Sequence, residues 1–260
     1  MPRDHEGRTI DFGRRAEDYD AHRPGFPPRF FDHVGERGWI PATGTALDLG
    51  TGTGSLALEW ARRGLDVTAL DIAPELLRIV ARRAASEGLE VRTIEATAEA
   101  TGLADDSVDL VTAGQCWWWF DADRAARESR RVLRPGGRLL ICNFSYLALP
   151  GSAAERTERL VLAHNPGWPK AGWRGVHPEQ VQALDVAGFD AVESFSFTID
   201  VPFSHLGWRG RMRTCNGVGS ALAPDEVERF DAELTELLAA AFPDPFPVRH
   251  RVFATSGVLA

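Results

Sequence analysis

The segment that most constrains the fold is a short apolar run that ends in an acid and three alternating glycines. It reads Ala46-Leu47-Asp48-Leu49-Gly50-Thr51-Gly52-Thr53-Gly54, and a helical pattern follows at once. This order is typical of a β-strand, a tight turn and the N-terminus of a helix. Glycines adopt a positive φ easily and let a ligand approach the backbone with no Cβ in the way. The segment therefore predicts a loop that binds a nucleoside-containing cofactor.

The spacing of the glycines narrows the choice of cofactor. The pattern here is G-x-G-x-G, whereas dinucleotide-binding loops carry G-x-G-x-x-G. A Walker phosphate loop is excluded because no Gly-Lys-Ser/Thr follows. Taken alone, the segment is also compatible with a plain glycine-rich turn between a strand and a helix.

Strand and helix patterns alternate through the first half of the chain, which predicts βαβ units and a doubly wound, mostly parallel α/β sheet. After the glycine segment, helices are expected at 56–63, 74–86 and 124–133, and strands at 67–72, 91–94, 108–113 and 138–144. In the second half we expect helices at 178–187 and 224–241 and strands at 189–201 and 248–258.

Several later blocks add to the glycine segment. They are Asp71-Ile72-Ala73, Ala96-Thr97-Ala98-Glu99, Ser107-Val108-Asp109-Leu110-Val111 and Leu133-Arg134-Pro135-Gly136-Gly137-Arg138. In this order the blocks resemble the class I (Rossmann-like) S-adenosylmethionine-dependent methyltransferases, over residues 45–144 and more loosely beyond. The stretch 16–24 is similar to the small-molecule branch that includes trans-aconitate-type methyltransferases. The resemblance implies a seven-stranded sheet whose last strand is antiparallel, S-adenosylmethionine as cofactor and S-adenosylhomocysteine as product.

The resemblance also implies an organisation within one domain. Residues 1–36 form an N-terminal flap and cap helix, residues 37–144 the cofactor-binding core, and residues 145–260 complete the sheet and carry insertions that cover the substrate. Two long excursions, 145–176 and 202–247, support the last point, because long loops in compact domains are usually functional.

Two acids are central to the cofactor site that the resemblance implies. Asp48 orients the methionine ammonium, or alternatively caps the glycine turn. Asp71 accepts hydrogen bonds from the ribose hydroxyls, or alternatively is a surface acid that caps the next helix. The complete expected set of cofactor contacts is Tyr19, Arg23, Asp48, Gly50, Thr51, Gly52, Gly54, Asp71, Ile72, Leu76, Thr97, Ala98 and Gln115.

The chain departs from the family pattern at two positions. Thr97 stands where the family usually has an aspartate, and its hydroxyl is a weaker acceptor for the adenine amino group. Trp118 stands where relatives often have a histidine, which removes one candidate general base. No catalytic residue is therefore assigned. Tyr19 and Arg23 share a helix face toward the ligands, with a surface salt bridge as the alternative for Arg23.

The acceptor contacts are sought in the covering segments and beside the fourth strand. Arg211 and Arg213 suit a carboxylate, which guanidinium groups bind bidentately, but a solvated basic loop is an alternative. Tryptophans suit an apolar acceptor body or simply wall the core, and a lone histidine is often structural. The candidates are Trp118, Trp119, Trp168, His177, Trp208, Arg211 and Arg213.

Composition excludes several functional classes. A net charge of −8 argues against a nucleic-acid partner, which needs a basic face. The three widely spaced cysteines suit a reducing cytoplasm and have no zinc-ligand spacing. Without a signal peptide or a long apolar run, no membrane association is expected. We expect a cytoplasmic monomer or homodimer that acts on a small molecule and uses no metal.

The expected activity is transfer of a methyl group to a small-molecule acceptor, with O-methylation of a carboxylate or hydroxyl favoured. Two alternatives belong to other classes. The chain could bind S-adenosylmethionine without transferring its methyl group, as a cyclase or regulatory protein would. It could also be an NAD-dependent oxidoreductase, although the glycine spacing and the expected antiparallel last strand argue against that.

Overall fold

The computed structural model describes residues 22–260, and these divide into two compact units. The sheet unit consists of residues 25–144, 176–196 and 252–260. The helical unit consists of residues 145–175 and 197–251, together with residues 22–24 of the described N-terminal part. The divisions fall inside three strands of the sheet, so each unit gathers segments that are distant in sequence.

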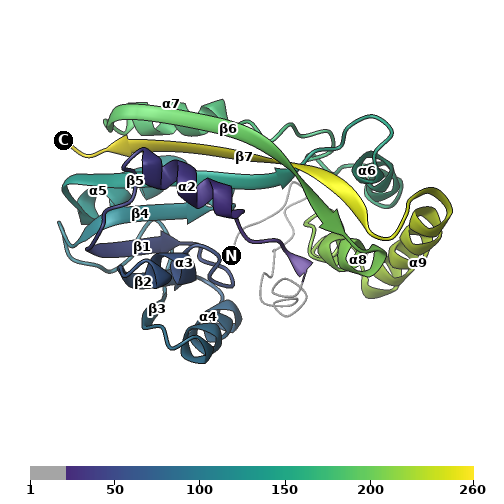
Figure 1. Ribbon diagram of the computed structural model, residues 1–260, viewed down its shortest axis with the longest axis horizontal. Helices are drawn as coiled ribbons and strands as arrows, with labels where there is room; N and C mark the ends of the chain where they lie inside the picture. Colours follow the sequence, from purple (N-terminus) through teal and green to yellow (C-terminus); the bar gives the residue numbers. More distant parts are fainter. Residues whose placement is uncertain (1–21) are drawn as a thin grey trace. The chain divides into compact units, whose positions relative to one another are not determined.

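The sheet has seven strands in the order β3-β2-β1-β4-β5-β7-β6 (Figure 1). The strands are β1 (Thr45–Leu49), β2 (Asp66–Asp71), β3 (Val91–Glu95), β4 (Val108–Gly114), β5 (Leu133–Tyr146), β6 (Asp190–Phe203) and β7 (Phe246–Val258). The first five pair in parallel. Backbone bonds join Gly137 to Leu259 and Leu147 to Arg249, so β7 runs antiparallel to β5. The predicted sheet, mostly parallel with an antiparallel last strand, is confirmed.

Helices connect the strands of the sheet. The sheet unit contains α2 (Pro28–Glu36), α3 (Ala57–Arg62), α4 (Pro74–Ser86), α5 (Ala122–Val132) and α7 (Pro178–Val186), with a short 3-10 turn, η2 (Trp117–Trp119). The helical unit contains α6 (Ala153–His164), α8 (His205–Arg213) and α9 (Pro224–Ala241). Three of these begin at a proline that the sequence also marked as a helix start, in α4, α7 and α9, because proline suits the first turn.

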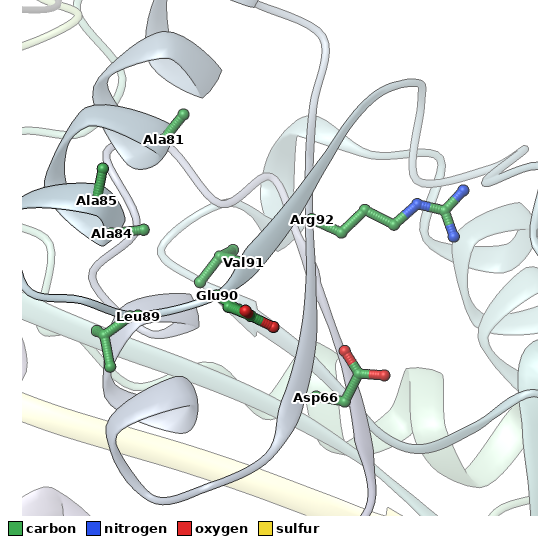
Figure 2. Close-up of a pocket in the computed structure, with 8 residues that line it drawn as sticks. All are labelled: Asp66, Ala81, Ala84, Ala85, Leu89, Glu90, Val91 and Arg92. Carbon is green, nitrogen blue, oxygen red and sulfur yellow. The ribbon is translucent and has the colours of Figure 1, made fainter.

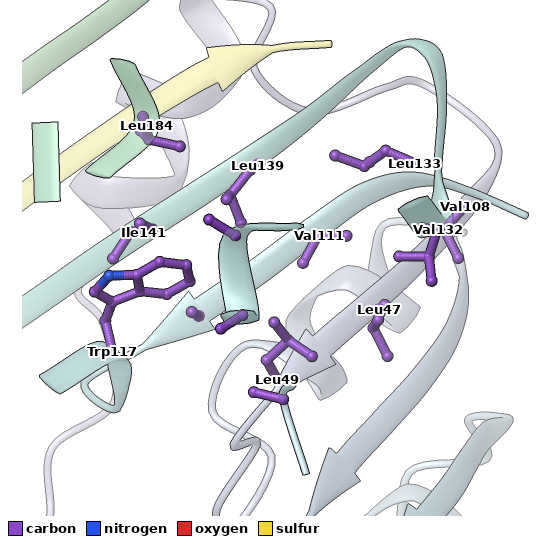
Figure 3. Packing of buried hydrophobic residues seen from close by; sticks show 14 of the residues in the cluster. Leu47, Leu49, Val108, Val111, Trp117, Val132, Leu133, Leu139, Ile141 and Leu184 are labelled. Carbon is purple, nitrogen blue, oxygen red and sulfur yellow. The ribbon is translucent and has the colours of Figure 1, made fainter. Parts of the chain in front are cut away.

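The hydrophobic core of the sheet unit lies between the middle strands and helices α5 and α7. Leu47, Val111 and Leu139 are completely buried, and Ile141 and Leu184 pack in the same cluster (Figure 3). Burying one such side chain contributes about 1.5–3 kcal/mol relative to leaving it exposed. This packing fixes the strands from which the site residues emerge.

The helical unit has a core of its own. Trp208 and Met212 on α8 pack with Phe230 and Leu234 on α9, and all four are completely buried. The spacing of Phe230, Leu234 and Leu238 places one apolar stripe along α9, as expected for an amphipathic helix. The unit is thus held together by hydrophobic contacts among its own residues.

Candidate functional site

The glycine loop joins β1 to α3 and is bonded to the end of β2. Gly50 and Gly52 both have a φ of 57°. A Cβ on Gly50 would lie 3.0 Å from Cβ and Sγ of Cys116, so both the backbone conformation and the close neighbour require glycine. The N–H of Thr51 donates to the carbonyl of Leu70 at 2.9 Å, which fixes the loop against β2.

Asp71 is the last residue of β2 and is 6% exposed. One carboxylate oxygen accepts the N–H of Gly52 at 2.9 Å, and the other accepts the N–H of Ala73 at 3.0 Å. Burial raises the pKa of Asp71, and the backbone hydrogen bonds oppose that rise. A carboxylate has about four lone-pair sites, so acceptor capacity is left for a pair of ligand hydroxyls.

Asp48 lies under the same loop and is 2% exposed. Its oxygens accept hydrogen bonds from the Thr112 hydroxyl at 2.6 Å and the Thr51 hydroxyl at 2.7 Å. Burial raises the pKa of Asp48 to about 6, although both hydroxyls favour the ionised form. The carboxylate therefore joins β1, β4 and the glycine loop, which is the turn-capping role that the sequence left open. A contact with the cofactor ammonium stays a prediction.

The residues expected around the adenine follow β2 and β3. The N–H of Ala96 donates to the Asp71 carbonyl at 3.2 Å, which ties the segment after β3 to the end of β2. Ala98 is buried in the core, whereas Thr97 is exposed. Leu76 is buried in the first turn of α4, and Ile72 is half-buried just before that helix. The structure thus brings these four predicted contacts to the carboxyl ends of neighbouring strands.

Gln115 directly follows β4 in a strained conformation. Its φ is 62°, in the left-handed region that costs a non-glycine residue about 1–2 kcal/mol. Its N–H donates to the Cys142 carbonyl at 2.9 Å, and its side-chain amide donates to the Phe144 carbonyl. Backbone strain of this kind clusters at functional sites, which agrees with the cofactor contact predicted for Gln115.

The three consecutive tryptophans in η2 have different environments. Trp117 is 3% exposed and lies in the core beside Ile141 (Figure 3), so it is the one that walls the core. Trp118 and Trp119 are half-buried. Trp119 also packs against that core, whereas the indole of Trp118 stacks on the imidazole of His177, with ring centroids 6.0 Å apart and an interplanar angle of 18°.

His177 comes from the start of α7, far from Trp118 in sequence. Its side chain is completely buried, and its Nδ1 lies 3.0 Å from Oε1 of Glu179. The Phe253 ring packs against the imidazole at 5.7 Å. The sequence included His177 among the candidates but did not predict its meeting with Trp118, because only Pro178 marked a structural feature there.

Arg23, Trp168 and Trp208 belong to the helical unit, and the predicted contact Tyr19 lies outside the described residues. Arg23 donates to the hydroxyl and the carbonyl of Thr214, at 3.0 and 2.8 Å. The indole N–H of Trp208 donates to Thr157 at 3.0 Å, and this ring is completely buried. Trp168 is 5% exposed and donates to Asn216 at 3.1 Å. Acceptor contacts by the two tryptophans stay predictions.

Arg211 and Arg213 differ sharply in their surroundings. The Arg211 guanidinium lies 4.9 Å from the centroid of the Tyr146 ring and is 8% exposed as a residue. The Arg213 guanidinium lies 3.2 Å from the Asp231 carboxylate, which also binds Arg209. Burial alone would raise the pKa of Asp231, but the two arginines hold it below its usual value. The ion pair supplies a structural role for Arg213.

A surface pocket lies at the opposite end of β2 from Asp71. Figure 2 shows its lining residues, Asp66, Ala81, Ala84, Ala85, Leu89, Glu90, Val91 and Arg92. Asp66 begins β2 and Asp71 ends it, so the pocket is distinct from the predicted cofactor site. Within residues 22–260, no cluster of three histidine, cysteine or acidic side chains is arranged to hold a metal ion. In that same part of the chain, every helix is too short or too polar to cross a bilayer.

Comparison with known proteins identifies the family. Residues 47–141 match the family model of a methyltransferase domain. A malonyl-[acyl-carrier protein] O-methyltransferase from Enterobacter lignolyticus is 33% identical over 230 residues, which cover 84% of this chain and 81% of that protein. The chain belongs to the class I S-adenosylmethionine-dependent methyltransferases.

The chain is also similar to other members of that family. The chain spans about half the length of the curated relatives it matches first, such as the uncharacterized methyltransferase Rv3342 of Mycobacterium tuberculosis, which is 42% identical over 132 residues, 50% of this chain and 51% of that protein. A solved structure from Anaeromyxobacter dehalogenans, described as a candidate type II methyltransferase, has 27% identity and a TM-score of 0.69, with 91% of this chain and 98% of that chain covered.

Proposed function

We propose that this protein transfers the methyl group of S-adenosylmethionine to an oxygen atom of a small-molecule acceptor, a carboxylate or a hydroxyl. The observation that carries the proposal is the Asp71 carboxylate at the end of β2, held beside the glycine loop by the Gly52 N–H at 2.9 Å. Similarity to an O-methyltransferase over most of the chain favours oxygen as the accepting atom.

The chemistry of the residues present fits this cofactor. Asp71 offers carboxylate acceptors to the ribose hydroxyls. The glycine loop brings backbone N–H groups toward the methionine carboxylate without intervening side chains. Leu76 and Ile72 supply apolar contacts for the adenine, while Thr97 and Ala98 follow the neighbouring strand. When bound, S-adenosylmethionine supplies a methyl group that a nucleophile can displace from sulfur.

The contribution of the chain to such a reaction is alignment of the acceptor and exclusion of water. Holding two reactants in line can supply about 7–11 kcal/mol of the barrier in well-oriented systems. Gln115 and the two half-buried tryptophans lie at the carboxyl end of β4, where ligands bind in sheets of this topology. An acceptor that is already anionic needs no base, whereas a hydroxyl requires one.

The first experiment is isothermal titration with S-adenosylmethionine, S-adenosylhomocysteine and NAD, on the wild type and on two variants. Asp71→Ala should lose affinity for the first two ligands by about 10-fold or more, since charge-assisted hydrogen bonds contribute about 1.5–3 kcal/mol. Asp66→Ala is the matched control, because Asp66 lies at the other end of the same strand.

The outcomes separate the candidate functions. Micromolar binding of the sulfonium cofactor that depends on Asp71, followed by transfer of its labelled methyl group to an acceptor oxygen, is the expected result. Retention of the labelled methyl group on the cofactor through turnover would instead favour a protein that does not transfer it. Binding of NAD alone would overturn the proposal.

A further inference from the structure

Asn143 lies on β5 between two residues whose backbone carbonyls accept hydrogen bonds from the strained residue Gln115. The Gln115 N–H donates to the carbonyl of Cys142, and its side chain donates to the carbonyl of Phe144. The register of the sheet pairs Cys142 with Gly114, the last residue of β4. Asn143 is therefore located at the carboxyl ends of β4 and β5, where this fold binds its ligands.

Two polar residues, Asn143 on β5 and Gln180 on α7, lie next to the hydrophobic core and bond to each other. Ile141 packs with Leu184 in the core (Figure 3), and Asn143 is the next residue on the same face of β5. Gln180 precedes Leu184 by about one helical turn. The Asn143 side-chain N–H donates to the Gln180 side-chain oxygen at 2.8 Å, and both residues are 1% exposed.

The other polar atom of the Asn143 side chain is unsatisfied. Its oxygen Oδ1 is buried and has no hydrogen-bond partner among the described residues. The indole N–H of Trp117, in the neighbouring core cluster, is likewise buried and unbonded in that part of the chain. A buried acceptor that is left without a hydrogen bond costs about 1–3 kcal/mol. Apolar residues at both Asn143 and Gln180 would avoid this cost, so the polar pair is not explained by the stability of the fold.

His177 occupies the same end of α7. The N–H of Gln180 donates to the His177 carbonyl at 3.1 Å, which closes the first turn of the helix. Since an ionised carboxylate can only accept, the contact with Glu179 places the imidazole proton on Nδ1 and leaves Nε2 as the basic nitrogen. The rings of Trp118 and Phe253 pack against the imidazole. A histidine–carboxylate pair of this kind is a frequent general base.

We propose that Asn143 and His177 select a neutral hydroxyl acceptor that carries a second hydrogen-bond donor, in preference to a carboxylate. Asn143 Oδ1 accepts the hydrogen bond of the second donor and repels a carboxylate, which has no proton to give. His177 is the catalytic base for the hydroxyl that becomes methylated. This inference rests on the proposed function and names the acceptor class for the same site.

The chemical step conserves atoms and charge. The acceptor oxygen forms a bond to the methyl carbon while the bond from that carbon to sulfur breaks, and the sulfur keeps the electron pair. The hydroxyl proton moves to Nε2 of His177, and Glu179 stabilises the imidazolium that results. S-adenosylhomocysteine and the methyl ether leave, and the imidazolium releases its proton to solvent.

The first test measures binding, with catechol, phenol and benzoate as probes on protein loaded with S-adenosylhomocysteine. The wild type should bind catechol at least 10-fold more tightly than phenol or benzoate. The double variant Asn143→Leu/Gln180→Leu replaces both polar partners by apolar groups, a change that is often neutral or stabilising. It should keep the wild-type Tm and cofactor affinity and lose the preference for catechol. A fall in Tm with the preference intact would show a structural role and overturn the proposal.

The second test measures turnover against pH. His177→Gln should lower kcat for catechol by about 10²–10⁴-fold, as expected for loss of a general base, and should change the dependence of kcat on pH. The matched control is His164→Gln, because His164 also pairs with a glutamate, Glu233 at 3.3 Å, but on α6. Turnover of benzoate but not catechol, or an unchanged His177→Gln profile, would overturn the inference while leaving methyl transfer intact. Absence of any methyl transfer would instead contradict the proposed function.

Discussion

Asp71 and Gly52 are joined by a hydrogen bond of 2.9 Å from the glycine N–H to the buried carboxylate. The acid predicted to bind the ribose is therefore also a support of the loop predicted to bind the methionine end. Removing the Asp71 side chain should therefore affect both ribose binding and the support of the glycine loop. We expect Asp71→Ala to lower the free energy of unfolding by about 1–3 kcal/mol, because two backbone donors lose their acceptor. Urea unfolding checks this, and the exposed Asp66→Ala should change stability by no more than about 0.5 kcal/mol.

Because the pKa of Asp48 is raised, we expect an unusual dependence of protein stability on pH. Its pKa in the folded protein is about 6, above the ordinary value of 3.8, so the folded state holds a proton that the unfolded state releases between these values. The contribution of this group is favourable at low pH and is lost as the pH rises from about 4 to 6, by about 3 kcal/mol at most. Asp48→Asn should flatten the Tm profile in that window. An unaltered profile would show that Asp48 does not titrate there.

We expect a side chain at Gly50 to have a steric effect, and Gly88 provides the control position. Alanine at Gly50 would meet Cys116 at 3.0 Å in addition to adopting a positive φ, whereas alanine at Gly88, with a φ of 68°, meets nothing within 4 Å. Gly88→Ala should therefore cost only the backbone term of about 1–2 kcal/mol. Gly50→Ala should cost more and weaken cofactor binding. Equal losses in chemical denaturation would contradict the close packing against Cys116.

We expect substitutions at Arg211 and Arg213 to have different effects on protein stability. Arg213→Gln should reduce stability by about 1 kcal/mol or less, because its ion pair with Asp231 is partly exposed, and should leave the KM of every acceptor unchanged. The buried Arg211 lies over Tyr146, so Arg211→Gln should destabilise the helical unit more strongly. Thermal unfolding and acceptor kinetics on both variants check this. A raised KM in Arg213→Gln would restore its predicted role as a substrate contact.

The cysteines predict resistance to alkylation. Cys116, Cys142 and Cys215 are all buried, and burial raises the pKa of the Cys116 and Cys142 thiols well above the ordinary value. Since the thiolate is the reactive species, native protein should react slowly with iodoacetamide and rapidly after unfolding. Fast labelling of Cys116 in the native state would show that the Gly50 region opens.

Local signals in the sequence predicted elements well where helix starts were marked. Helices α4 and α9 begin and end where the proline and the apolar spacing placed them. The sequence interpretation overlooked α6, although Ser152 followed by Glu155 is a capping pattern, and Ser152 does accept the Glu155 N–H. The strand was expected to begin at residue 138, after a helix that ends at 133, but Gly136 and Gly137 pair with Leu259, and β5 already begins at Leu133.

In the candidate site, too, only features with a local sequence signal could be predicted. Glycines and acids at strand ends were predictable because one segment carries both the turn and the ligand chemistry. The contact between Trp118 and His177, and the unsatisfied oxygen of Asn143, depend on how α7 returns to β5. Such pairings over long sequence separations have no local signature, so the sequence alone could not supply a base.

The division of the chain inside β5, β6 and β7 has a consequence for protein engineering. A graft that moved only the helical unit from one family member to another could not exchange a single contiguous cassette. It would have to splice the chain within three hydrogen-bonded strands and preserve the pairing register at each splice. We therefore expect recombination between relatives to succeed most often when the whole segment from β5 to β7 is inherited from one parent.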